Sequence, residues 1–264
     1  MSEPTVLFEE RGAIGLLTLN RPQALNSLTR QMHRDVWAVL DRVDANTQLR
    51  ALVITGAGRG FCAGADLSEF DFAEGPGLIE RADPGPVIDQ AFNPTTRRLQ
   101  RCRVPLIAAV NGVAAGAGAS IAMACDIVIA APSASFIQAF SKIGLIPDAG
   151  GSWFLVERLG LARAMALAMT GDKLSAQQAK EWGMIWDVAD DCLAASLAMA
   201  ERLAVMPTRA LTETRHLLRG AGSRTLDQQL DIERDTQSAL GRTHDYFEGV
   251  KAFLEKRQPQ FKGE

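Results

Sequence analysis

The chain has 264 residues, of which 47% are hydrophobic and 22% charged, and its formal net charge is −3. This length suffices for one large domain, or for a core domain with a helical appendage. The weakly acidic balance provides no basic field for nucleic acid or anionic lipid. The sequence also lacks an apolar run near the roughly 18 residues that a membrane helix needs. We therefore expect a globular protein that binds neither nucleic acid nor membrane.

The N-terminal stretch MSEPTVLFEERG lacks the basic start, the apolar middle and the cleavage site of a secretory signal. We therefore expect a cytoplasmic protein. The cysteines form no CxxC pair, so the sequence predicts neither a zinc site nor a disulfide framework, but reduced and partly buried thiols. These cysteines are Cys62, Cys102, Cys125 and Cys192.

The first 130 residues alternate between strand-like and helix-like patterns. Segments rich in β-branched and apolar residues are bounded by glycine or asparagine, as in AIGLLTL and LRALVITG. Between them, apolar residues recur at helical spacing from Met32 to Val43. This alternation predicts an α/β fold. The expected strands are residues 5–10, 13–19, 49–56, 105–110 and 126–131, and a small-residue helix is expected to start near Ala117.

Two segments depart from this alternation. Residues 71–88 are rich in proline, glycine and acidic side chains, which favours a mobile excursion that could cover a substrate. Ser175-x-x-Gln178 is a capping-box pattern that opens a helix. Amphipathic helices are expected beyond it, so we divide the chain into a core (1–195) and a helical oligomerisation region (196–264). The tail helices are expected at 193–205, 209–218, 226–240 and 245–256.

Two glycine-rich turns follow predicted strands. GAGRGFCAGADL (56–67) matches neither the dinucleotide fingerprint nor the P-loop pattern. Small residues here, and in Gly116-Ala-Gly118, leave backbone N–H groups open to a ligand. Two such turns could direct one N–H each at the same oxygen, which would form an oxyanion hole. Alternatively, the glycines only permit tight turns and close helix packing.

With both turns placed, the chain resembles the enoyl-CoA hydratase/isomerase (crotonase) superfamily over nearly its full length. The matching stretches are LTLNRPQALNSL, LVITGAGRGFCAGADL, PLIAAVNGVAAGAGASIAMACDIVIA, IGLIPDAGGSW, MTGDKLSAQQAKEWGM and EGVKAFLEKRQPQF. The resemblance implies a spiral of ββα units with a C-terminal helical trimerisation region. It also implies an acyl-CoA ligand, no metal or redox cofactor, and assembly as homotrimers or dimers of trimers.

The resemblance also assigns site residues. The backbone N–H groups of Ala65 and Ala117 would hold the thioester oxygen, although the family usually has glycine at the second position. Gly116, Ser120, Phe140 and Pro147 would line the acyl pocket. Coenzyme A would run past Gln23, Ala24, Leu25, Ala63, Asp66 and Leu67, with Phe253 and Lys256 of a neighbouring subunit near its nucleotide, although Lys256 could equally be a solvated tail residue.

The family's hydratases use two glutamates, and the matching positions here are Ser120 and Phe140. Neither side chain can act as a general base at neutral pH, so efficient hydration is not expected. Asp148 remains as the one carboxylate expected in the acyl pocket, a position where dienoyl-CoA isomerases and 4-chlorobenzoyl-CoA dehalogenase also carry aspartate. The companion residues of those two enzymes are absent.

The closest resemblance within the superfamily is to the isomerases of ring-epoxidised phenylacetyl-CoA. It implies conversion of the epoxide to oxepin-CoA and movement of 3-enoyl double bonds to the 2-position, in aerobic phenylacetate catabolism. Two alternatives stay open, namely an enoyl-CoA hydratase of fatty-acid β-oxidation and an acyl-CoA-binding scaffold without chemistry.

Asp148 has a second interpretation, as the N-cap of the helix that follows it. The helix dipole would then lower its pKa, whereas burial among Phe140, Ile143, Leu145, Ile146 and Trp153 would raise it. Ser120 could in principle be a nucleophile, but GAGAS is not the G-x-S-x-G pattern. Its only candidate bases are His33, His216 and His244.

Overall fold

The computed structural model describes residues 3–264. Residues 1 and 2, which begin the N-terminal stretch MSEPTVLFEERG discussed above, lie outside the described residues. The larger sheet has the strand order β1-β2-β3-β5-β7-β10. The first two strands form an antiparallel hairpin, and the other neighbours are parallel. The strands are β1 (Val6–Arg11), β2 (Ile14–Leu19), β3 (Ala51–Gly56), β5 (Leu106–Val110), β7 (Ile127–Ala130) and β10 (Asp187–Val188).

A smaller sheet has the order β4-β6-β8-β9, with β4, β6 and β8 parallel and β9 antiparallel to β8. Each of β3, β5 and β7 is followed by one strand of this sheet and then by helix, so a ββα unit repeats three times. The expected spiral is confirmed. The small sheet did not emerge from sequence patterns, because three-residue strands carry no measurable periodicity. Its strands are β4 (Gly60–Cys62), β6 (Val113–Ala115), β8 (Ser135–Ile137) and β9 (Lys173–Ser175).

The helices follow the expected boundaries closely. Ser175 and Gln178 form the predicted capping box at the start of α7. All eight residues of α5 are buried, because alanine, glycine and serine allow the helix to fit between its neighbours. The helices of the core are α1 (Arg30–Ala45), α4 (Asn93–Arg101), α5 (Ala117–Ala124), α6 (Gly151–Thr170) and α7 (Ala176–Glu181), with 3-10 turns η1 (Pro22–Ala24), η2 (Leu67–Glu69) and η4 (Ala139–Ile143).

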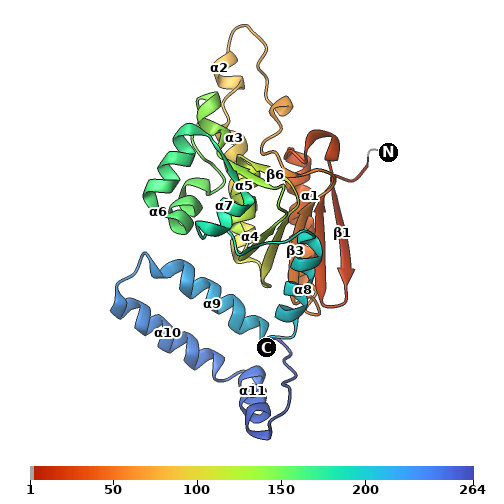
Figure 1. Ribbon diagram of the computed structural model, residues 1–264, viewed down its shortest axis with the longest axis vertical. Coiled ribbons are helices and arrows are strands. Elements are labelled where there is room, and N and C mark those ends of the chain that lie inside the picture. The colour runs from red at the N-terminus through yellow and green to blue at the C-terminus, as the bar shows by residue number, and fades with distance from the viewer. Residues whose placement is uncertain (1–2) are drawn as a thin grey trace.

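Residues 71–88 project from the body of the molecule (Figure 1). They contain the single-turn helices α2 (Leu78–Arg81) and α3 (Gly85–Val87) and lead into a π-helical turn, η3 (Ile88–Phe92). Most of their side chains are exposed. Arg81 organises the excursion, because its guanidinium donates to Asp71 and to the carbonyl oxygens of Ala73 and Pro76.

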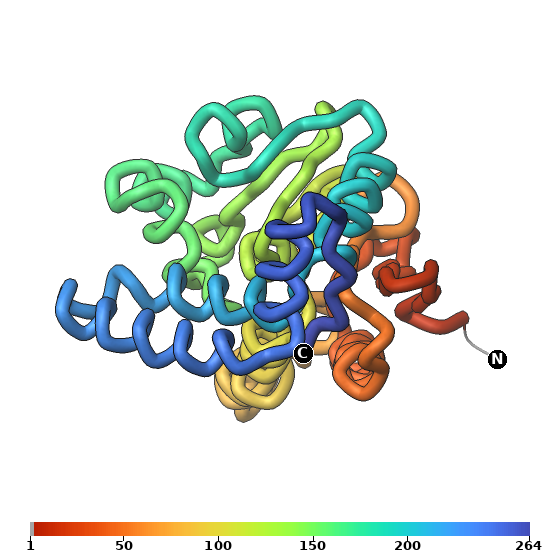
Figure 2. Tube along the Cα trace, turned by 90° about the horizontal axis from the view of Figure 1, so that it is seen from below, coloured from red at the N-terminus to blue at the C-terminus, as the bar shows by residue number. Residues whose placement is uncertain are grey.

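The C-terminal helices divide into two groups. Helix α8 (Cys192–Ala204) packs on β3 and β5, and the boundary expected between residues 195 and 196 falls inside it. The next two helices, α9 (Thr208–Ala221) and α10 (Leu226–Leu240), lie side by side away from the sheets, and α11 (His244–Glu255) follows (Figures 1 and 2).

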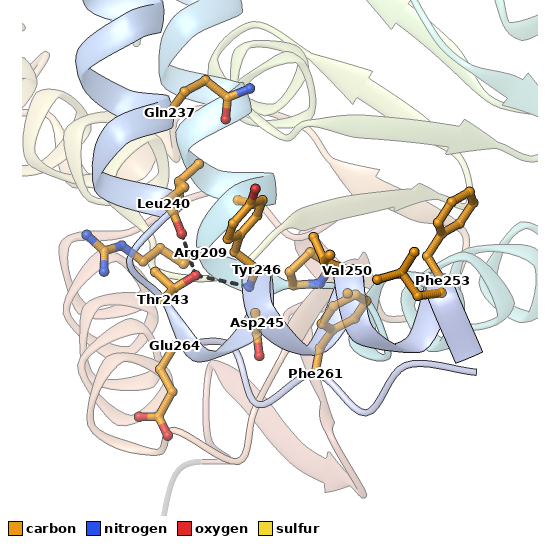
Figure 3. A pocket seen from close by; sticks show the side chains of 14 residues that line it. Arg209, Gln237, Leu240, Thr243, Asp245, Tyr246, Val250, Phe253, Phe261 and Glu264 are labelled. Atoms are coloured by element: carbon orange, nitrogen blue, oxygen red, sulfur yellow. Dashed lines mark hydrogen bonds between the residues drawn. The ribbon is translucent and has the colours of Figure 1, made fainter. Parts of the chain in front are cut away.

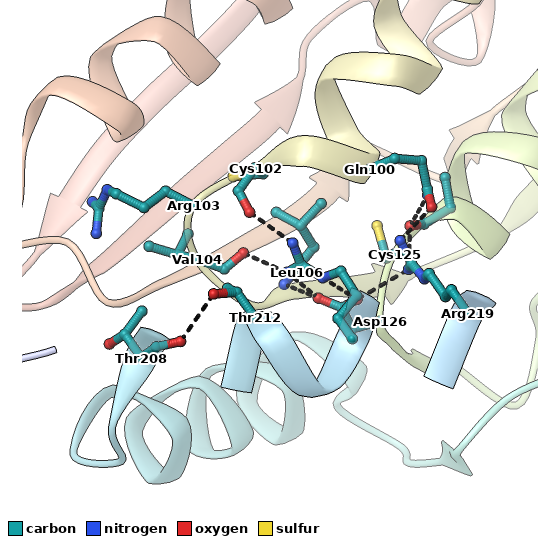
Figure 4. Close-up of polar contacts among 12 residues, drawn as sticks. Gln100, Cys102, Arg103, Val104, Leu106, Cys125, Asp126, Thr208, Thr212 and Arg219 are labelled. Carbon is teal, nitrogen blue, oxygen red and sulfur yellow. Dashed lines mark hydrogen bonds and ion pairs between the residues drawn. The ribbon is translucent and has the colours of Figure 1, made fainter. Parts of the chain in front are cut away.

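One buried ion pair attaches α9 to the core. Arg215 donates from Nε and Nη2 to the carboxylate of Asp126 at 2.8 and 2.6 Å, and to the carbonyl oxygens of Cys102 and Val104. Arg219 contacts the same carboxylate at 3.0 Å (Figure 4). The segments that lead into β5 and β7 are thereby joined to the C-terminal helices.

Candidate active site

The residues assigned to the oxyanion hole and the acyl pocket follow the strands of the small sheet. Ala65 comes shortly after β4, Ala117 after β6 and Phe140 after β8. Because these three strands are parallel, their carboxyl ends meet at one edge of the sheet. The fold therefore gathers residues that are far apart in the sequence. Asp148 joins them from the turn before α6.

The amide groups of Ala65 and Ala117 have no hydrogen-bond acceptor within residues 3–264. Ala117 is the first residue of α5, where helical N–H groups lack internal partners. The two turns are in contact, since a Cβ atom added at Gly64 would lie 3.4 Å from the Ala117 nitrogen. Two unpaired donors thus stand on adjoining turns, as an oxyanion site requires.

Gly116 shapes the second turn, because its φ of 52° and ψ of −128° place it outside the conformations open to most residues. A Cβ atom added there would lie 3.6 Å from the Phe140 ring. The ring is buried and lies close to Gly116, the residue before Ala117. A hydratase would carry a glutamate in this place, and the aromatic ring supplies no proton-transfer group.

The side chain of Asp148 caps no helix. The N-cap of α6 is Gly150, and no side-chain hydrogen bond caps that helix. Instead, the Oδ1 atom of Asp148 is buried without a partner. Burial raises the pKa of Asp148 to about 6, against a weaker opposing hydrogen bond from its own amide. The cap interpretation is wrong, and the carboxyl group has the pKa of an acid/base near neutrality.

The apolar surroundings expected for Asp148 are only partly present. Phe140 is buried, but the other four side chains are exposed: Ile143, Leu145, Ile146 and Trp153. The expectation failed because the single-turn η4 and the following loop lie at the surface and point most of this apolar run outward. Ser120 contacts the aspartate more closely, as its hydroxyl donates to the Asp148 carbonyl oxygen at 3.0 Å.

The segments assigned to coenzyme A lie beside the oxyanion turn. The amide of Ala63 donates to the Leu25 carbonyl, and Leu28 pairs with Ala65 in a parallel bridge. Asp66 forms an ion pair with Arg21 at 2.7 Å. Burial would raise the pKa of Asp66, but hydrogen bonds from Ser68 and Arg21 outweigh it and hold the pKa at about 2. Gln23, Ala24 and Leu67 complete this group, and Gln23 and Leu67 are exposed.

The two residues expected from a neighbouring subunit lie elsewhere in the chain. Phe253 is 83% exposed, and Lys256 ends α11, on the side of the molecule away from α5 (Figure 1). Phe253 also lines a cavity of about 410 Å³ between α9, α10, α11 and the C-terminal tail (Figure 3). Within one chain, neither residue can contact Ala65 or Ala117.

Ser120 and the histidines do not pair with one another in the described part of the chain. The Ser120 hydroxyl donates to a carbonyl group, and the three histidines have other partners: His33 contacts Thr95, His216 contacts Glu213 and His244 contacts Asp245. Residues 3–264 hold no group of three or more histidine, cysteine, aspartate or glutamate side chains that could bind a metal ion. Within the same residues, no helix has the length and apolar character to cross a membrane. All four cysteines are free and buried, as expected.

Comparison with known proteins supports the same assignment. The model of the enoyl-CoA hydratase/isomerase family matches residues 9–264. The chain belongs to this family. The family acts on acyl-CoA thioesters, and the solved structures agree in fold. An enoyl-CoA hydratase from Polaromonas sp. JS666 is 36% identical, with a TM-score of 0.88 over 97% of this chain and 99% of that chain.

Among curated relatives in the family, 1,2-epoxyphenylacetyl-CoA isomerase of Escherichia coli is 51% identical over the whole of both chains. A probable enoyl-CoA hydratase of Rhodobacter capsulatus is 41% identical, also over the whole of both chains. The 2,3-dehydroadipyl-CoA hydratase of Escherichia coli is 36% identical over the same extent. This family member therefore combines a hydratase-like fold with greater identity to an isomerase.

Sequence patterns missed the residues that hold Asp148. Thr96, in α4, donates to the carbonyl oxygen of Ala149 at 3.0 Å across a separation of 53 residues. No local pattern could reveal such a contact. The positive φ of Ala149, 49°, was likewise not predicted from the sequence. The adjoining pair Gly150-Gly151 was its only local signal, since consecutive glycines often mark a tight turn.

Proposed function

We propose that this protein is an acyl-CoA isomerase that converts 2-(1,2-epoxy-1,2-dihydrophenyl)acetyl-CoA to oxepin-CoA and shifts 3-enoyl-CoA double bonds to the 2-position. The proposed setting is aerobic phenylacetate catabolism in the cytoplasm. Two observations carry the proposal: the half-buried carboxyl group of Asp148 has an Oδ1 atom without a partner and a pKa of about 6, and the amides of Ala65 and Ala117 have no acceptor within residues 3–264. The 51% identity to the Escherichia coli isomerase supports the substrate.

For the double-bond shift, Asp148 would remove a proton from the carbon next to the thioester carbonyl. The electron pair of that C–H bond moves into the carbonyl and leaves an enolate oxygen between the N–H groups of Ala65 and Ala117. These donors stabilise charge that the ground-state carbonyl lacks, typically by about 3 kcal/mol each. The protonated carboxyl of Asp148 then returns the proton at the γ carbon, and the double bond is conjugated with the thioester.

A single carboxylate suits this reaction because the proton leaves and returns to the same substrate. For the ring epoxide, we assign Asp148 the corresponding proton-handling role. Hydration, in contrast, requires groups that activate water. Ser120 and Phe140 stand in the two positions concerned, and the Ser120 hydroxyl is already engaged with the Asp148 carbonyl. We therefore propose isomerisation in preference to hydration, although several relatives are named as hydratases.

The proposal includes the substrate contacts and the assembly. Gly116, Ser120, Phe140 and Pro147 would line the acyl group, and coenzyme A would lie along residues 23–25 and 63–67. Phe253 and Lys256 would reach the nucleotide of a neighbouring subunit, since both lie far from the amides of their own chain (Figure 1). We propose residues 196–264 as the region that forms trimers or dimers of trimers. The exposed apolar side chains on α10 and α11 support this assignment.

The test compares the protein with Asp148→Asn on three substrates: 3-hexenoyl-CoA, 2-hexenoyl-CoA and enzymatically made epoxyphenylacetyl-CoA. We expect the unaltered chain to isomerise the first and third. The variant should keep coenzyme A binding and assembly but lose turnover by at least about a hundredfold. Asp190→Asn, at an exposed aspartate, is the matched control.

Products are identified by mass and ultraviolet absorbance. Rapid hydration of 2-hexenoyl-CoA would show that the protein is a hydratase. If the protein converts none of the three substrates, the acyl-CoA-binding scaffold is the better interpretation. If the Asp148→Asn variant isomerises 3-hexenoyl-CoA at the normal rate, Asp148 is not the acid/base.

A further inference from the structure

The turn that carries Asp148 has a strained backbone. The Gly151 amide donates to the Asp148 carbonyl at 2.7 Å, which closes a four-residue turn. Its two central residues both have positive φ, 49° at Ala149 and 82° at Gly150. Glycine adopts this conformation freely, whereas alanine does so at a cost. Such outliers persist only where the surrounding structure enforces them.

Two hydroxyl groups hold the strained turn from different helices. Ser120 of α5 donates to the carbonyl oxygen of Asp148, and Thr96 of α4 donates to the next carbonyl, that of Ala149; both distances are 3.0 Å. Consecutive peptide groups are therefore tied to two separate parts of the core. Ala149 itself is buried, so the core surrounds the turn on this side.

The two glycines of the turn permit these contacts. A Cβ atom added at Gly151 would lie 2.5 Å from the Ser120 Oγ atom. At Gly150, an added Cβ atom would lie 3.4 Å from Thr96 Cγ2. A side chain at Gly151 would push Ser120 away from the turn, whereas one at Gly150 would clash with the Phe154 ring, 2.8 Å from the added Cβ atom, and only touch Thr96. The turn, Ser120 and Thr96 therefore form one packed unit.

The carboxyl group of Asp148 has a weak hydrogen bond from its own amide but no comparable support from another residue. Its Oδ1 atom lacks a hydrogen-bond partner, and no charged side chain of the described residues forms an ion pair with it. The place of the carboxyl group is consequently determined by the backbone beneath it. A rotation of the strained turn would carry the group towards solvent and away from the substrate carbon.

We propose that Thr96 and Ser120 are positioning residues that keep the strained turn in the conformation in which Asp148 reaches the substrate. This inference rests on the proposed acid/base function of Asp148. Each hydroxyl is engaged with a backbone carbonyl oxygen, so we assign it no part in proton transfer. Loss of a hydroxyl should therefore reduce kcat and alter the titration of the base, but leave the binding of coenzyme A unchanged.

The test uses Thr96→Val, which keeps the shape of threonine, and Ser120→Ala. With 3-hexenoyl-CoA, each variant should lose about tenfold to a hundredfold in kcat, as expected for a small displacement of a catalytic group. KM should change less than about twofold. The acid limb of the kcat/KM profile should move below pH 6 as Asp148 becomes hydrated, because burial causes its raised pKa.

Thr96→Ser restores the hydroxyl and should recover most of kcat. Thr214→Val is the matched control, since Thr214 is exposed on α9 and bonds only to its own helix. Wild-type kcat and an unmoved acid limb in folded Thr96→Val and Ser120→Ala would overturn the inference. The two substitutions are independent, so one misfolded variant leaves the other to decide.

The Asp148→Asn variant separates the two hypotheses. If it is inactive while both hydroxyl variants behave like the wild type, the positioning role is wrong and the proposed function stands. If it remains active, the acid/base assignment itself is wrong, whatever the hydroxyl variants do.

Discussion

A carboxyl group at position 148 is both the proposed catalytic base and a source of instability. The pKa of Asp148 is about 6 in the folded chain, above its ordinary value of 3.8, because burial disfavours the ionised form. Between these values the folded protein binds the proton more tightly than the unfolded chain does. Stability from this group is therefore present at low pH and is lost as the pH rises through 6.

Asp148→Asn should accordingly be more stable than the parent at pH 7.5, by up to about 3 kcal/mol, since the amide has a similar shape and no charge to bury. The advantage should shrink as the pH is lowered to 4.5. Urea unfolding at several pH values, at constant protein concentration, measures the difference. An advantage that is constant with pH would show that ionisation of Asp148 does not cause it.

At the scale of the element, charge and hydrogen bonding attach α9 to the core. Arg215 is 7% exposed and satisfies Asp126 and two backbone carbonyls at once. Burial of ions is costly, but removal of one partner leaves the other uncompensated. The docking of α9 therefore depends on one side chain more than on its helical periodicity.

Arg215→Met should lower the free energy of unfolding by about 3–5 kcal/mol, because Asp126 and the carbonyls of Cys102 and Val104 lose their shared donor. Arg234→Met provides the control, as Arg234 is exposed on α10 and pairs only with Asp231 and Asp235. Its urea midpoint should be unchanged. A loss below about 1 kcal/mol in Arg215→Met would mean that Arg219 alone suffices to dock α9.

At the scale of the whole molecule, α11 lies away from α5 and the candidate site of its own chain (Figure 1). Exposed apolar side chains on α11 include Phe247, Phe253 and Leu254. If a neighbouring α11 covers the coenzyme A site, two defective chains can complement each other.

A Phe253→Ala, Lys256→Ala chain should show a KM for acyl-CoA raised about tenfold, the equivalent of about 1.4 kcal/mol of binding. In mixed oligomers of the α11 variant and the Asp148→Asn variant, some sites should regain a normal KM. At these sites the α11 variant supplies Asp148, and the neighbouring Asp148→Asn chain supplies an intact α11. Steady-state kinetics on co-expressed, purified oligomers measure this. Kinetics equal to those of the α11 variant alone would place Phe253 and Lys256 outside the partner's site.

The order of strands and helices could be predicted from the sequence because it depends on local patterns. The hairpin of β1 and β2, the helix α1 and the capping box of Ser175 all depend on residues within a few positions of one another. The replacement of both hydratase glutamates, by Ser120 and Phe140, is likewise visible in the sequence and indicates which chemistry the family fold has lost.

Only the tertiary structure decided that the side chain of Asp148 does not cap α6. The local sequence DAGG is compatible with a helix cap and with a tight turn, and the choice depends on which residue takes the cap conformation. Thr96 and Ser120 come from distant helices and hold the turn, in which Gly150 is the cap and the Oδ1 atom of Asp148 is buried without a partner. Contacts over such separations depend on how the helices pack, which no local pattern records.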